Sequence, residues 1–143
     1  MFVVLPSSAD DYSGVERDAK NWFQTTYAPI WKDAEDVDID KVRSHYANGY
    51  RVHLSDGEFR IAANSNKEWI EALKYFGDSW IGSDLKYITV IALSANSAAI
   101  RSGWANRNGD GTTFYNCANY VATRTEEIGW QFLDLFFFTG CAQ

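Results

Sequence analysis

The residues "WQFLDLFFFTG" (130–140) decide the fold. As a strand, this stretch is apolar on both faces and carries one carboxylate, Asp134, near its middle. A strand of an antiparallel sheet usually has one face on the core and the other in water. Both faces of this strand must therefore be covered, and the rest of the chain has to supply what covers them.

Three segments before this strand show the same period of two, over residues 85–95, 97–107 and 112–124. Short turns at 95–96, 108–111 and 125–128 separate the four strands, which predicts an antiparallel meander. The first half of the chain is helical instead. Apolar residues recur every three or four positions in 13–31, 37–49 and 65–77, and a short hairpin is expected around Asp56-Gly57. The prediction is an α+β fold, with three N-terminal helices packed on the concave face of a curved, mostly antiparallel sheet.

Length and composition narrow the class of protein. The 143 residues suit one domain, 1–143, and the net charge of −6 argues against nucleic acid and anionic membranes as partners. No stretch has the pattern of a targeting segment or a membrane span. Cys117 and Cys141 form no metal-ligand pattern and are interpreted as thiols, so we expect a cytoplasmic protein without metal or cofactor.

The turn positions predict which side chains share a face of the sheet. With those turns, Asp134 lies opposite Asn119, Asn119 opposite Ile100, and Ile100 opposite Ile91. This outer face is broad and aromatic, and an exposed surface of that kind usually marks a partner. A symmetric homodimer is the simplest partner. The predicted dimer interface consists of Trp104, Tyr115, Asn119, Trp130, Phe132, Asp134 and Phe136.

The opposite face is rich in alanine and glycine and carries three polar groups, Arg101, Asn116 and Tyr120. Small residues leave room for helices or for a cavity, and a few converging polar groups are typical of a small-molecule site. The candidate ligand-binding residues are Arg101, Asn116, Tyr120, Trp22, Tyr27, Tyr50, Leu54 and Leu135.

The order of elements and three stretches resemble the nuclear transport factor 2-like, or SnoaL-like, superfamily. The stretches are "YANGYRVHLSDGEFRIAANSNKEWIEAL" (46–73), "AAIRSG" (98–103) and "IGWQFLDLFFFTG" (128–140). The resemblance implies a cystatin-like cone with an interior cavity and a homodimer through the outer sheet face. It also places Arg101, Tyr120 and Leu135 inside. Leu54 stands where steroid isomerases of this superfamily have their catalytic base, and Gly103 where limonene epoxide hydrolases have an acid, so neither catalytic set is intact.

Each candidate has a structural alternative. Arg101 either anchors a ligand carboxylate or pairs with a helix acid such as Glu71 or Asp18. Tyr120 either donates to an oxyanion or is a core tyrosine. His53 is either a general base or an outward, solvated side chain, and its alternation with Arg51 favours the second. Trp22 and Tyr27 either contact a ligand or fill the core.

Three functions therefore stay open. The first is a protein that binds a small hydrophobic or carboxylate-bearing ligand, with Arg101 as the polar anchor. The second is a cofactor-independent isomerase, cyclase, dehydratase or hydrolase acting on a hydrophobic ring, with His53 or Tyr120 as weak catalytic candidates. The third is a domain that only dimerises.

Overall fold

The computed structural model describes residues 11–53, 59–61 and 65–138. Leu54 and the expected turn at Asp56-Gly57 lie outside these ranges. The helical elements are α1 (Ser13–Trp22), η1 (Phe23–Tyr27), η2 (Ala28–Trp31), η3 (Ala34–Asp36), α2 (Ile39–Ser44), α3 (Asn66–Ala72) and η4 (Leu73–Phe76). The strands are β1 (Tyr46–His53), β2 (Phe59–Ile61), β3 (Trp80–Ser94), β4 (Ser97–Asn108), β5 (Thr113–Thr125) and β6 (Gly129–Phe138).

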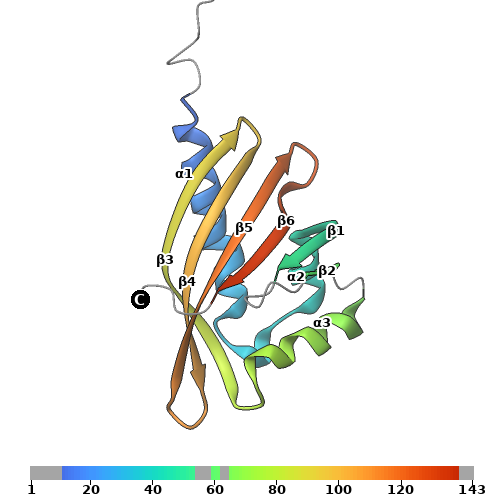
Figure 1. Cartoon of the computed structure of the whole chain (residues 1–143), viewed down its shortest axis with the longest axis vertical. Coiled ribbons are helices and arrows are strands. Elements are labelled where there is room, and N and C mark those ends of the chain that lie inside the picture. The colour runs from blue at the N-terminus through green and yellow to red at the C-terminus, as the bar shows by residue number, and fades with distance from the viewer. Residues whose placement is uncertain (1–10, 54–58, 62–64, 139–143) are drawn as a thin grey trace, which may run out of the picture.

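One six-stranded sheet, in the order β2-β1-β6-β5-β4-β3, forms the body of the fold. All its neighbouring strands are antiparallel except β1 and β6, which run parallel. Figure 1 shows the long strands curving, with α1 lying across one side of them and α2 and α3 gathered near β1. The predicted α+β class, with helices on one face of a curved, mostly antiparallel sheet, is confirmed.

The helices begin and end for local reasons. The Asp38 side chain accepts hydrogen bonds from the first amides of α2, and Ser65 and Glu68 form a reciprocal capping box on α3. The first helix changes pitch after Trp22, through the π-helical turn η1 into the 3-10 turn η2, which contains Pro29. The predicted second helix, 37–49, was too long, since the chain already enters β1 at Tyr46.

The pairing of β4 with β5 differs by one residue from the predicted one. Ile100 lies opposite Tyr120, and Arg101 opposite Asn119, because five residues, 108–112, separate the paired Arg107 and Thr113. The prediction assumed a four-residue turn. A slip of one residue exchanges the two faces of a strand. In β4, therefore, Ile100 and its alternate neighbours face the helices, and Arg101 faces away.

A bulge in β6 answers how a strand can be apolar on both faces. Val121 pairs with Asp134 and Ala122 with Phe132, so Leu133 is an extra residue without an opposite partner. The alternation restarts there. Phe132 packs inward at 0% exposure, Leu133 is exposed, and Asp134 lies on the outer face.

Cys117 corrects another prediction. It lies on β5, 2% exposed, and it is disulfide-bonded rather than a free thiol. Cys141, the other cysteine of the sequence, lies outside the described residues. The expected cytoplasmic location therefore loses the support of free thiols, because disulfides persist in oxidising environments.

Candidate functional site

A cavity of about 630 Å³ lies between the concave face of the sheet and the helices, in the size range of small-molecule sites. Half of its lining residues are aromatic. The helical side and β1 contribute Tyr27, Trp31, Tyr46, Tyr50, Trp69, Leu73, Tyr75 and Phe76. Val52 also comes from β1, and the remaining strands contribute Ser83, Trp104, Asn106, Asn116, Ala118, Tyr120, Leu135 and Phe137.

A tyrosine cluster forms one polar part of this lining. The hydroxyl oxygens of Tyr27 and Tyr46 are 2.5 Å apart and share a hydrogen bond. The π-helical turn η1 carries Tyr27, and the ring of Tyr120 packs against it with centroids 5.8 Å apart. Burial, and then the neighbouring tyrosine, raises the pKa of Tyr27, of Tyr46 and of Tyr120 well above the usual value. All three are neutral hydroxyls at pH 7 and can donate hydrogen bonds.

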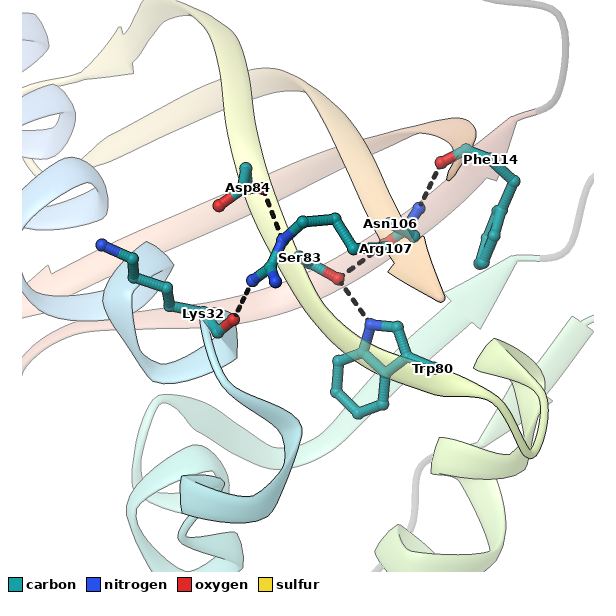
Figure 2. A network of polar contacts seen from close by, with 7 residues as sticks. All are labelled: Lys32, Trp80, Ser83, Asp84, Asn106, Arg107 and Phe114. Atoms are coloured by element: carbon teal, nitrogen blue, oxygen red, sulfur yellow. Dashed lines mark hydrogen bonds and ion pairs between the residues drawn. The ribbon is translucent and has the colours of Figure 1, made fainter. Parts of the chain in front are cut away.

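A chain of neutral side chains forms the second polar part (Figure 2). Trp80 Nε1 donates to Ser83 Oγ at 3.0 Å, and Ser83 Oγ donates to Asn106 Oδ1 at 2.6 Å. Asn106 Nδ2 then donates to the Phe114 carbonyl at 3.3 Å and to Asn116 Oδ1 at 2.9 Å. Ser83, Asn106 and Asn116 are all at most 4% exposed, so these bonds satisfy groups that water does not reach.

Beside this chain, an arginine joins the helices to the sheet. Arg107 Nε donates to Asp84 Oδ2 at 2.8 Å, and its Nη2 donates to the Lys32 carbonyl just after η2 (Figure 2). Gly82 permits this approach, because a Cβ there would meet the same Lys32 oxygen at 1.9 Å. The contact fixes η2, and with it Trp31, at the cavity wall.

The cavity carries little charge. Its only carboxylates among the described lining residues are Glu68 and Glu71, both exposed on α3. Glu68 also caps its own helix, and Glu71 pairs with Lys74 at 2.9 Å. No lysine, arginine or histidine belongs to the part of the lining that the structure describes. The site therefore offers hydrogen bonds in an apolar wall and no buried counter-charge.

Five of the predicted ligand-binding residues come together in this lining: Tyr27, Tyr50, Asn116, Tyr120 and Leu135. Arg101 does not, since it is exposed on the outer face. Trp22 packs on Trp130 and Phe132 beside the cavity and is not part of its lining. Leu54 lies outside the described residues. Sequence reasoning missed Asn106, which a five-residue turn in the prediction would have placed beside Asn116.

The outer face of the sheet holds the charged groups instead. Asp134 accepts hydrogen bonds from Arg51 Nε at 2.9 Å and from His53 Nε2 at 3.2 Å. The ring of His53 stacks on Phe136, with centroids 4.2 Å apart. The prediction that His53 points away from the cavity is confirmed; its ring bonds Asp134 while its side chain stays 31% exposed.

The predicted dimer residues divide between the two faces. Tyr115, Asn119, Asp134 and Phe136 lie on the outer face, as the pairing of β4, β5 and β6 requires. Trp104, Trp130 and Phe132 were placed there wrongly. They are at most 6% exposed in the core between sheet and helices, because the five-residue loop and the Leu133 bulge reverse the alternation.

The described residues contain neither a cluster of metal ligands nor a long apolar helix. No group of three or more His, Cys, Asp or Glu side chains is placed to hold a metal ion. None of the described helices has the length and apolar character needed to cross a membrane.

No protein-family model matches the sequence, and no curated protein matches it either. Several solved structures, by contrast, are similar to this chain. A candidate scytalone dehydratase from Novosphingobium aromaticivorans superposes with a TM-score of 0.63 at 14% identity, over 93% of this chain and 99% of its own. A candidate ketosteroid isomerase from Shewanella frigidimarina gives 0.62 at 12% identity, over 87% and 97%. An NTF-2 like protein of unknown function from Pseudomonas aeruginosa gives 0.63 at 12% identity, over 85% and 97%. This chain therefore has the nuclear transport factor 2-like fold that its sequence resembles.

Proposed function

We propose that this protein binds a small, neutral ring compound in the aromatic cavity. The observation that carries the proposal is the neutral character of the lining: two hydrogen-bonded polar groups lie in an apolar wall, and no described cation faces them. Burying a ligand carboxylate there would be costly, since a buried charge needs a partner. This replaces the expectation of a carboxylate-bearing ligand anchored by Arg101.

A thermal-shift comparison of matched probes tests the proposal. Naphthalene-sized neutral compounds such as 1-tetralone should raise the melting temperature, and 1-naphthoate should not. Ala72→Trp should abolish the shift, because Ala72 is an exposed α3 residue that lines the cavity. Ile70→Trp on the same helix, outside the lining, is the control, and Arg101→Ala should bind normally. Equal stabilisation by 1-naphthoate, or no effect of Ala72→Trp, would overturn the proposal.

A second candidate is an enzyme acting on the same class of ring compound as an isomerase, cyclase, dehydratase or hydrolase. The buried hydroxyls of Tyr27, Tyr46 and Tyr120 support it, since neutral tyrosines can stabilise an oxyanion. The names of two structural neighbours, a candidate dehydratase and a candidate isomerase, point the same way. His53, on the outer face, is not the base of such a reaction. Exchange of the 1-tetralone α-protons in D₂O, followed by NMR and lost in Tyr120→Phe, would favour the enzyme over the binding protein.

We also propose a homodimer through the outer sheet face, where Tyr115, Ile91 and Leu93 are 44–60% exposed. Light scattering measures the mass directly, and Ile91→Glu should return a dimer to monomers. A dimer whose cavity binds no probe would favour the pure association domain. The cytoplasmic location stays a prediction, and the disulfide at Cys117 counts against it.

A further inference from the structure

The hydrogen-bond chain from Trp80 to Asn116 runs in one direction only. An indole N–H can donate and cannot accept, so Trp80 Nε1 fixes Ser83 Oγ as its acceptor at 3.0 Å. The Ser83 hydroxyl has one proton of its own, and it points to Asn106 Oδ1 at 2.6 Å. The first links of the chain therefore have a defined donor at each step.

The orientation of the Asn106 amide is fixed from its other end. Asn106 Nδ2 lies 3.3 Å from the Phe114 carbonyl oxygen, which can only accept. With the amide turned over, two carbonyl oxygens would face each other, and the Ser83 proton would lose its acceptor. The Nδ2 group must point toward Phe114 and Asn116, so the atom of Asn116 that it meets at 2.9 Å must be the acceptor Oδ1.

Because Oδ1 of Asn116 bonds Asn106, the amide nitrogen of Asn116 is the atom that faces the cavity. Asn116 is 4% exposed and belongs to the cavity lining, and its Nδ2 donates to no group in the described part of the chain. Two N–H donors thus stand in a wall whose neighbouring polar side chains, Ser83 and Asn106, already bond within the chain of hydrogen bonds. An apolar ligand that keeps water from these donors leaves them unpaired at a cost of about 1–3 kcal/mol, and a ligand with a suitably placed acceptor avoids that cost.

We propose that Asn116 determines which ligands the cavity takes, by donating a hydrogen bond to an acceptor oxygen such as a ring carbonyl. The inference rests on the proposed function and narrows it from neutral ring compounds to neutral ring ketones and related acceptor-bearing rings. The chain from Trp80 allows only this polarity, because Asn116 cannot turn its own carbonyl to the ligand without breaking its bond to Asn106.

The test compares 1-tetralone with tetralin, which has the same rings and lacks the oxygen. Calorimetry gives the dissociation constant of each, and the quantity of interest is their ratio, measured in the wild type and in Asn116→Leu. Leucine keeps the volume and removes the donors, so the advantage of the ketone should fall by about tenfold while tetralin binding is retained. Asn119→Leu, three residues along the same strand on the outer face, should leave the ratio unchanged.

A second variant covers the case in which Asn116→Leu fails to fold. In Asn116→Asp one oxygen still accepts from Asn106, and the other faces the cavity. A protonated acid there can donate to the ketone and an ionised one repels it, so 1-tetralone should bind more weakly as pH rises. The wild-type amide should show no such trend.

Three results separate the two proposals. If neither probe binds the wild type, the proposed function fails and this inference fails with it. If both probes bind and the ratio is the same in wild type and Asn116→Leu, the cavity binds rings but Asn116 does not select them. If Asn116→Asp binds 1-tetralone with the same affinity at every pH, the donor role is likewise wrong.

Discussion

The two faces of the sheet carry polar groups of opposite kinds. On the concave face the buried polar side chains are amides and hydroxyls, joined by hydrogen bonds that start at an indole donor. On the outer face they are ions, with Asp134 between Arg51 and His53. The outer group keeps contact with water, since the Arg51 side chain is 56% exposed. Among the described residues, the buried polar side chains of the concave face are neutral, as the cost of burying charge requires.

The largest difference between the faces should be in packing. Phe132 is fully buried and contacts the rings of Trp22, Tyr27 and Tyr120, whereas Phe136 stacks on the surface beside His53. Phe132→Ala should lower the free energy of unfolding by about 3–5 kcal/mol, because it leaves a cavity among rigid rings. Phe136→Ala on the same strand should cost no more than about half of that. Urea denaturation measures both, and equal losses would mean that the outer face is as buried as the core.

A smaller loss of stability should follow from breaking the chain of hydrogen bonds that runs from Trp80 to Asn116. Asn106→Leu takes the acceptor from Ser83 and the donor from Asn116, and a buried group left without a partner costs about 1–3 kcal/mol. Asn119→Leu is the matched change on the outer face. Asn119 Oδ1 has no partner among the described residues, so its removal should be neutral or slightly stabilising. A loss for Asn119→Leu as large as that for Asn106→Leu would contradict the proposed difference between the faces.

The sequence could predict alternation within a strand but not the relation between strands. Asn116, Tyr120 and Leu135 were placed inward, and Asn119 and Asp134 outward, as the structure has them. Arg101 was placed inward because nothing in "NRNGDGTT" (106–113) says whether four or five residues leave the ladder. The sequence likewise gives no signal for the bulge at Leu133, since a leucine suits either face of a strand. Tertiary packing, which buries Trp104 and Asn106, decides the register.

The ion cluster on the outer face should matter less than either interior change. Asp134→Asn removes the carboxylate from Arg51 and His53, but both partners are partly in water, with side chains 56% and 31% exposed. We expect a loss of about 0–1 kcal/mol in the free energy of unfolding, as for other accessible ion pairs. Urea denaturation at low and high salt checks this, since the loss should shrink as salt screens the charges. Asp134 itself is only 8% exposed, so a salt-independent loss of several kcal/mol would indicate that its two partners are shielded from water as well.

The smallest effect concerns His45, which lies at the end of α2 with its ring edge-on to Trp22 and Tyr27. Burial, and then the charge of Lys41, lowers the pKa of His45 below its ordinary 6.5. The unfolded chain therefore takes up the proton at a higher pH than the folded one. The stability that the neutral ring contributes is complete above about pH 6.5 and is lost as the pH falls toward the folded value.

Unfolding free energies of the wild type and His45→Gln between pH 7.5 and 5.5 measure this effect. The wild type should lose stability more steeply on acidification, because glutamine takes up no proton. Parallel curves would show that the folded and unfolded chains bind this proton equally. NMR gives the same answer without denaturation. The sequence has two histidines, so the imidazole signal that disappears in His45→Gln belongs to His45, and it should titrate below pH 6.5. A midpoint at or above that value would mean that the His45 ring is open to water. The region from which water is excluded would then not extend to the end of α2.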